Sequence, residues 1–163
     1  MEKYRKMLQD MGADSAKVID AATVVTAPWV RYKCQYGCAK YGKSWRCPPN
    51  SPTHKQTREM LGCFNTGILF SCRDLSIVTE MAVKTAREMF FDGYYKAIAF
   101  GSGPCEKCRE CNEKGCIFPN DVVPAMEACG IDVFQTVQNN GYEIHTLRSK
   151  DETANYFGLI LVE

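Results

Sequence analysis

The sequence has no excess of either charge and no long apolar run. Its 163 residues carry 20 Lys and Arg against 19 Asp and Glu, so no strong field attracts nucleic acid or an anionic membrane. The first residues, MEKYRKMLQDMG, lack the apolar core of a signal peptide, and no later window approaches the ~18 apolar residues needed to cross a bilayer. We therefore expect a cytoplasmic protein that binds neither nucleic acid nor membrane.

Internal repeats and nucleotide-binding fingerprints are also absent. Gly and Pro gather at a few joints and form no linker, which predicts one domain over residues 1–163. The stretch GSGPC, 101–105, opens neither a G-x-G-x-x-G helix nor a P-loop, and we expect its glycines to let the backbone approach a metal. The lack of a cofactor motif favours a carrier over an enzyme, and nothing in the sequence indicates the oligomeric state.

Cysteine, by contrast, is abundant, with ten residues in the chain. The cytosol keeps thiols reduced and a core of this size needs no disulfides, so metal binding is the leading explanation. Seven of the cysteines form two groups: Cys34, Cys38 and Cys47 in CQYGCAKYGKSWRCPP, and Cys105, Cys108, Cys111 and Cys116 in CEKCRECNEKGC.

The second group has the more specific spacing. Three cysteines at C-x2-C-x2-C resemble the bacterial ferredoxin run, whose thiolates hold three corners of a cuboidal cluster. Zinc is the competitor, because four thiolates also satisfy its tetrahedral preference, although structural zinc sites usually combine two separated pairs. Cys116 follows after four residues where the ferredoxin pattern has three, so it either completes this cluster or binds one held by the first group.

Two fully ligated [4Fe-4S] clusters need eight thiolates, one more than the two groups supply. The candidates for the eighth position are Cys129, Cys63, Cys72, His54 and an open iron. We expect Cys63 and Cys72 to behave as small apolar residues, and His145 to lie on a strand surface. Glu127 is either a solvated helix residue or a group at the edge of a cluster.

The pattern of apolar residues predicts an α/β chain of the α+β sandwich type on a mixed sheet. Predicted helices are 2–10, 51–61, a segment between Asp74 and Gly93, 121–129 and 132–139. Predicted strands are 18–25, 67–72, 95–101, and two that form a C-terminal hairpin, 142–149 and 155–163. The segment 67–101 reads as a right-handed βαβ unit with parallel strands, and the two cysteine groups lie in loops.

Three stretches together resemble domain-of-unknown-function family 2284 (DUF2284), small cysteine-rich prokaryotic proteins known as predicted metal-binding proteins. They are CQYGCAKYGKSWRCPPNSP, GPCEKCRECNEKGCIFPN and VPAMEACGIDVFQTVQNNG, and the resemblance covers roughly residues 25–162. It implies metal binding of the iron-sulfur type through Cys34, Cys38, Cys47, Cys105, Cys108, Cys111 and Cys116. The family brings no established reaction.

We therefore expect an iron-sulfur protein with two [4Fe-4S] clusters that passes single electrons to a redox partner through a transient contact. Two alternatives remain open. One is a cluster-dependent enzyme whose open iron binds a small molecule or thiol, and the other is a zinc-stabilised structural module.

Overall fold

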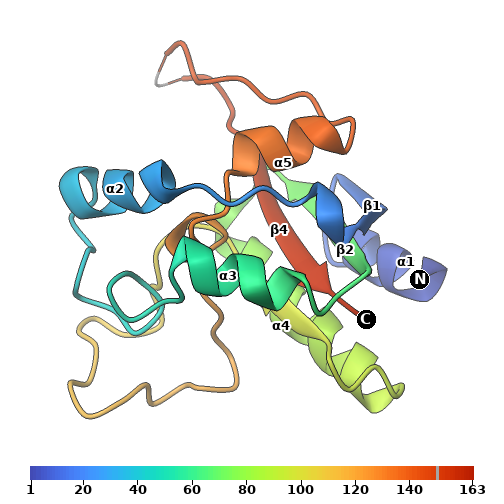
Figure 1. Ribbon diagram of the computed structural model, residues 1–163, viewed down its shortest axis with the longest axis horizontal. Coiled ribbons are helices and arrows are strands. Elements are labelled where there is room, and N and C mark those ends of the chain that lie inside the picture. The colour runs from blue at the N-terminus through green and yellow to red at the C-terminus, as the bar shows by residue number, and fades with distance from the viewer. Residues whose placement is uncertain (150) are drawn as a thin grey trace.

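The computed structural model describes residues 1–149 and 151–163, and a four-stranded sheet lies at its centre (Figure 1). The strands are β1 (Ser15–Asp20), β2 (Thr66–Cys72), β3 (Ile98–Phe100) and β4 (Tyr156–Leu161). The α-helices are α1 (Glu2–Asp10), α2 (Pro28–Gly37), α3 (His54–Leu61), α4 (Leu75–Phe91) and α5 (Val133–Asn139), and two short 3-10 helices are η1 (Ala21–Thr23) and η2 (Glu127–Cys129). In the described part of the chain, no helix is long and apolar enough to span a membrane.

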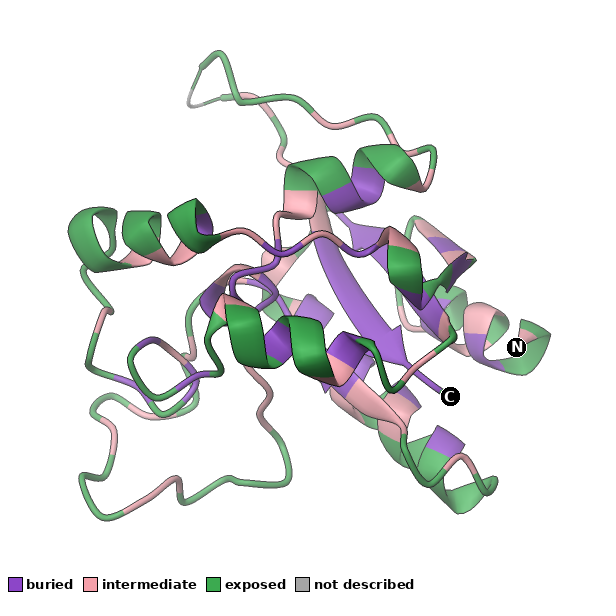
Figure 2. Cartoon of the chain, in the orientation of Figure 1, coloured by how far each residue is buried: buried purple, intermediate pink, exposed green. Residues whose placement is uncertain are grey.

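The strand order is β1-β2-β4-β3, and every neighbouring pair is antiparallel. Strands β2 and β3 therefore run in the same direction, as the βαβ prediction requires, but β4 lies between them. The expected mixed sheet is wrong, because no two parallel strands are neighbours among the described residues. Strand β4 is buried over nearly its whole length (Figure 2). It lies between β2 and β3, so both of its edges are paired, and helices cover both of its faces.

Helices cover both faces of the sheet, which confirms the α+β sandwich. Alternate residues of β2 and β4 point to opposite faces, and each face has its own core. Helices α1 and α4 pack on one face, with a core that includes Leu8, Ile68, Phe70, Val78, Met81, Met89 and Ile160. Helices α3 and α5 and η2 cover the other face, with a core that includes Leu61, Leu69, Met126, Ile131, Val137, Leu159 and Leu161.

The predicted C-terminal hairpin is wrong. Residues 142–149 form no strand, and position 150 of the expected turn lies outside the described residues. The side chains of this segment serve other contacts: Tyr142 donates a hydrogen bond to the carbonyl oxygen of Leu69 at 3.0 Å and packs edge-on against Phe157. Strand β4 instead takes both of its partners from earlier in the chain.

The predicted helix over 121–129 is reduced to η2. The part of the predicted helix before η2 is extended and runs alongside the end of β3, where Gly101 N donates to Pro124 O at 2.9 Å and Met126 N donates to Gly101 O at 3.2 Å. Backbone groups bonded in this way are not free to form a helix. The strand predicted at 18–25 likewise ends early, because the Asp20 side chain accepts a hydrogen bond from Ala22 N and starts η1.

The other helix boundaries follow local signals. Asp74 caps α4 by accepting a hydrogen bond from Ser76 N at 2.9 Å, and Gly93 after the helix has a φ of 101°, both as predicted. Helix α3 begins at His54, later than predicted, because Thr53 and Gln56 form a capping box. Helix α2 was not predicted, although its first residue, Pro28, is a favoured residue for that position.

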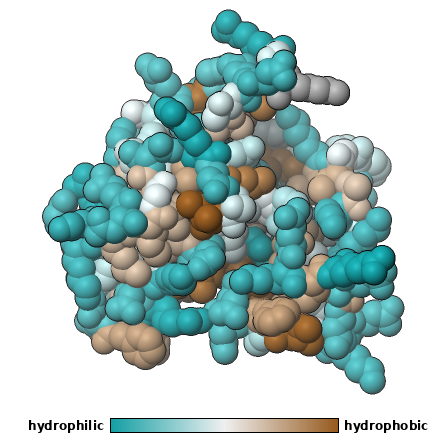
Figure 3. All heavy atoms as spheres, turned by 180° about the vertical axis from the view of Figure 1, so that it is seen from behind, coloured by the Kyte–Doolittle hydropathy of each residue, from teal (hydrophilic) through white to brown (hydrophobic). Residues whose placement is uncertain are grey.

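The back of the molecule shows mainly hydrophilic side chains, with hydrophobic atoms in a few separate patches (Figure 3). Helix α2 carries three exposed aromatic residues, Trp29, Tyr32 and Tyr36. That helix also carries the first cysteine.

Two buried threonines give opposite predictions for stability. Thr57 on α3 donates to the carbonyl oxygen of Cys129 at 2.7 Å, whereas the Thr85 hydroxyl on α4 has no partner among the described residues. Thr57→Val should lower the free energy of unfolding by about 1–3 kcal/mol, because it leaves a buried carbonyl unpaired. Thr85→Val should leave that free energy unchanged or raise it by up to about 1 kcal/mol, because it removes a buried hydroxyl without a partner.

The measurement is anaerobic urea unfolding of both variants at matched metal content. Each substitution keeps a β-branched side chain of the same shape in a helix, so the two variants control for each other. Equal destabilisation by both would contradict this account of the packing.

Candidate metal centre

The two cysteine groups lie beside the end of the sheet at which β2 and β3 finish. Strands β2 and β3 both end there because they run in the same direction, and the second cysteine loop leaves directly after β3. The first group is brought to this end by the start of α2, where Ala27 N donates to Gly130 O at 2.9 Å and Asp132 N donates to Val25 O at 2.8 Å. Both loops lie on the same side of the molecule (Figure 1).

The two loops also contact each other directly. Trp45 donates from its Nε1 to the carbonyl oxygen of Asn112 at 2.8 Å, which joins the first loop to the second. A cavity of about 660 Å³ lies between the loops, and its lining includes Ser44, Trp45, Cys105, Cys108 and Cys111. Trp45 therefore bridges the two loops, a role that its position in the sequence does not indicate.

The first group consists of Cys34 on α2, Cys38 just after it, and Cys47 in the following loop. Burial is the main cause that raises the pKa of the Cys34 thiol, and the charges of Cys38, Glu127 and Cys47 raise it further. The pKa of Cys47 is also raised, first by burial and then by Cys38 and Cys105, while a hydrogen bond from Ser44 lowers it. Cys47 thus lies close enough to Cys105 for the two groups to interact electrostatically.

The second group is close together as well. Burial, followed by the charges of Cys111, Cys105 and Cys116, raises the pKa of Cys108. Cys116 therefore lies with its own group in the structure. In both groups, ionisation of one thiol opposes ionisation of its neighbours, and a bound metal ion removes this opposition because it neutralises the thiolates.

The sulfurs are neighbours, but they do not converge on one point. In the described part of the chain, no three Cys, His, Asp or Glu side chains are arranged to hold one metal ion. Binding a metal would therefore require the two loops to draw their cysteines together.

Two arginines beside the first group show that the surroundings fit an anionic metal centre. Arg46 is 8% exposed and Arg31 is half-buried, and the Nε atoms of both are buried without a hydrogen-bond partner among the described residues. Their charges lower the pKa of neighbouring thiols, Arg31 at Cys34 and Arg46 at Cys47. Buried donors without partners are costly, and the sulfurs of a metal-thiolate centre accept such hydrogen bonds.

The remaining cysteines divide into two kinds. Cys72 is buried at the end of β2, where its sulfur accepts a hydrogen bond from Asp74 N at 3.3 Å, and Cys63 is exposed after α3. Neither lies with either group. Cys129 is fully buried in η2, close enough to Cys34 to feel its charge, and burial raises its pKa to about 12.

Each of the two histidines has a neighbour elsewhere in the chain. His54, at the start of α3, packs closely against Gly130: a Cβ added to Gly130 would lie 2.6 Å from the Cβ of His54. His145 is exposed, and its Nε2 lies 2.7 Å from Glu152 Oε1. Cys129 is therefore the eighth-ligand candidate that the structure places beside the first group.

The glycines of GSGPC were expected to let the backbone approach a metal, and the structure shows a packing role for both of them. A Cβ on Gly101 would lie 2.3 Å from Thr79 Oγ1, and one on Gly103, whose φ is 68°, would lie 2.9 Å from Leu75. Both glycines thus allow close packing against the first turns of α4. They fix where the second loop begins.

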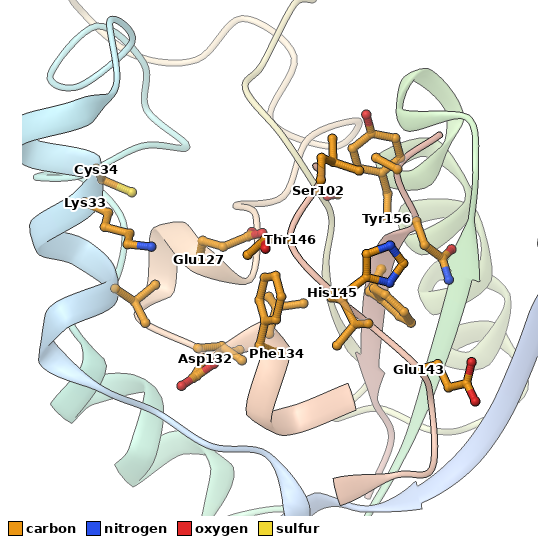
Figure 4. Close-up of a pocket in the computed structure, with 18 of the residues that line it drawn as sticks. Lys33, Cys34, Ser102, Glu127, Asp132, Phe134, Glu143, His145, Thr146 and Tyr156 are labelled. Atoms are coloured by element: carbon orange, nitrogen blue, oxygen red, sulfur yellow. The ribbon is translucent and has the colours of Figure 1, made fainter. Parts of the chain in front are cut away.

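A second cavity, of about 680 Å³, adjoins the first cysteine group, and Cys34 and Cys38 belong to its lining. Figure 4 shows Lys33 and Cys34 extending from α2 towards Glu127. Burial raises the pKa of Glu127, which favours its uncharged form. This cavity was not predicted, because it forms between segments that are far apart in the sequence.

Alkylation of the metal-free protein tests the placement of the cysteines outside the two groups. At pH 8, iodoacetamide should modify exposed Cys63 readily. Cys129 should react about a thousandfold more slowly until the protein is unfolded, because it is buried and the thiolate is the reactive form. Peptide mass spectrometry measures both rates, and equal rates at the two positions would show that Cys129 is not enclosed as described.

Comparison with known proteins gives one match. Residues 17–162 match the family described as predicted metal-binding protein, DUF2284. No curated protein and no solved structure matches the chain. The match covers both cysteine groups and all of the sheet except the first two residues of β1, and the chain therefore belongs to the DUF2284 family of predicted metal-binding proteins.

Proposed function

We propose that this metal-binding protein is an iron-sulfur protein of the cytoplasm that holds two [4Fe-4S] clusters and passes single electrons to a redox partner. Cys34, Cys38 and Cys47 would bind one cluster, and Cys105, Cys108, Cys111 and Cys116 the other. Such clusters supply one-electron redox chemistry at potentials set by their surroundings. The closeness of Cys47 to Cys105 supports a short path between them.

The observation that carries the proposal is the pair of arginines with unpaired donors. Arg31 and Arg46 are placed beside the first cysteine group, and each has a buried Nε without a partner among the described residues. The Nη2 atoms of the two side chains donate to protein oxygens, Arg31 to Ser51 O and Arg46 to Thr79 Oγ1, and the Nε donors remain for a ligand, an ion or water to satisfy. A cluster with thiolate ligands carries negative charge and sulfur acceptors, so it would satisfy both needs.

The charge of the surrounding chain agrees with this. Residues 21–58 contain no Asp or Glu, and they contain the seven basic residues Arg31, Lys33, Lys40, Lys43, Arg46, Lys55 and Arg58. The chain as a whole has a net charge of only +1. The positive charge is therefore concentrated around the first cysteine group.

The same segment offers a surface for an acidic redox partner. Trp29, Tyr32 and Tyr36 are 46%, 64% and 70% exposed along α2, and exposed aromatic residues are enriched in protein interfaces. The helix has no acidic residue, so an acidic partner fits it better than a second copy of the same basic face. Cys34 lies on the same helix, so a partner bound at this surface would be close to the first cysteine group.

A second candidate function is supported by the cavity of about 680 Å³ beside Cys34 and Cys38. If the first cluster has only three thiolate ligands, from Cys34, Cys38 and Cys47, its open coordination site could bind a small molecule, as in a cluster-dependent enzyme. If Cys129 is the fourth ligand, the protein would be a carrier alone. The other alternative is a structural module stabilised by zinc, and metal analysis distinguishes zinc from iron.

Metal and sulfide analysis of anaerobically purified protein tests the proposal. We expect a brown protein with about eight irons per chain, falling to about four in Cys108→Ala, because that change removes one ligand from the second group only. Cys63→Ala is the matched control and should keep about eight. A colourless protein with stoichiometric zinc would refute the iron-sulfur assignment.

The role of Arg46 gives a separate prediction. Arg46→Met should make the reduction potential of one cluster more negative, because it removes a buried positive charge beside Cys47. Arg46→Lys keeps a charge at this position and should shift the potential less. Redox titration at equal iron content measures both shifts, and an unchanged potential in Arg46→Met would contradict the role assigned to this side chain.

A further inference from the structure

The second cysteine loop, residues 105–116, is held by very few bonds. It contains no helix or strand, and none of the ion pairs among the described residues involves it. Within the loop, Lys114 N donates to Asn112 Oδ1 at 2.9 Å and Gly115 N donates to Asn112 O at 3.3 Å. In the described part of the chain, a single hydrogen bond joins the loop to another segment, and Trp45 Nε1 donates it to Asn112 O at 2.8 Å.

The backbone that carries Trp45 is held much more firmly. Ser44 and Arg46, its neighbours in the sequence, are both 8% exposed. Cys47 N and the side-chain amide of Asn50 both donate to Ser44 O at 3.2 Å, and Arg46 N donates to Ser44 Oγ at 3.2 Å. The Trp45 side chain is 41% exposed. A fixed turn therefore presents the indole N–H to a weakly held loop.

The cavity of about 660 Å³ between the two loops shows which cysteines Trp45 adjoins. Cys105, Cys108 and Cys111 line this cavity together with Trp45, and no cysteine of the first group belongs to the lining. Trp45 is two residues from Cys47 in the sequence, yet it shares a cavity with the second group. The first loop thus forms one wall of the space beside the second group.

We propose that Trp45 is a positioning residue for the second metal centre. Its bond to Asn112 holds residues 105–116 against the first loop and keeps Cys105, Cys108 and Cys111 at the shared cavity. The inference rests on the proposed role of the second group as metal ligands and on no particular metal.

The physical reason is the cost of ordering the loop. Metal binding requires the cysteines to draw closer together, and ordering a free loop costs conformational entropy. A loop that is already fixed at Asn112 loses less of this entropy, so it holds the metal more tightly. The stability of the second centre therefore depends on a side chain of the first loop.

Trypsin cleavage of the reduced, metal-free protein tests the loop contact without any metal. Trp45→Phe keeps an aromatic ring and removes the N–H donor. Cleavage inside the loop requires local opening, and we expect it to become about fivefold faster, as for loss of one hydrogen bond. The cleavage sites in the loop are Lys107, Arg109 and Lys114.

Two controls accompany this measurement. Trp29→Phe makes the same substitution on exposed Trp29 of α2, and it should leave the cleavage rate in the loop unchanged. Cleavage after Lys84, within α4, reports unfolding of the whole domain, and Trp45→Phe should not accelerate it.

Metal release then separates the two centres. Cys38→Ala disables the first group and Cys108→Ala disables the second, so each protein retains one intact group. We expect Trp45→Phe to accelerate metal release to a chelator about fivefold in the Cys38→Ala protein and less than about twofold in the Cys108→Ala protein. Bathophenanthroline disulfonate measures released iron, and 4-(2-pyridylazo)resorcinol measures released zinc.

The outcomes distinguish this inference from the proposed function. Zinc released with the expected pattern would support the role of Trp45 and refute the iron-sulfur proposal. An iron-loaded protein in which Trp45→Phe leaves either the cleavage rate or the release rate unchanged would overturn the role of Trp45 alone. Equal acceleration of release in the Cys38→Ala and Cys108→Ala proteins would also overturn it, because the effect would then not be specific to the second group.

Discussion

Repulsion between crowded thiolates is the constraint on which this site depends. Seven cysteines lie on α2 and in two loops, beside the end of the sheet where β2 and β3 finish. The pKa values of Cys34, Cys47 and Cys108 are raised partly by the charges of their neighbours. Such a group cannot ionise in full unless positive charge is supplied. Arg31 and Arg46 supply part of it, because their charges lower the pKa values of Cys34 and Cys47, and each has a buried Nε without a partner among the described residues.

The fold keeps this charged end separate from the core. Strands β2 and β3 finish at the same end of the sheet because they run in the same direction. Strand β4 lies between them, and its buried side chains contribute to the core on both faces of the sheet. The loops are then anchored from the protein interior: Ser51 Oγ donates to Ala128 O at 2.6 Å, and Thr57 Oγ1 donates to Cys129 O at 2.7 Å. These bonds hold the first loop against η2, and metal binding would require the cysteines of the two loops to move closer together.

The sequence indicated the parts of this arrangement that are local. Cysteine spacing identified both groups, and Asp74 and Gly93 marked the ends of α4. Pro28, the first residue of α2, is typical of that helix position, but α2 was not predicted. The position of β4 could not be predicted, because it is decided by pairing with β2 and β3, strands distant in the sequence. The unpaired Nε donors of Arg31 and Arg46 and the cavity beside Cys34 and Cys38 likewise depend on contacts between segments that are distant in the sequence.

The central claim is that the two cysteine groups hold two clusters close together. Electron paramagnetic resonance of the fully reduced, anaerobic protein tests it most directly, because neighbouring paramagnetic clusters broaden and split each other's signals. The account predicts an interaction spectrum that reverts to that of a single isolated cluster in Cys47→Ala. Two full-intensity signals without interaction, or a spectrum without any cluster signal, would contradict it.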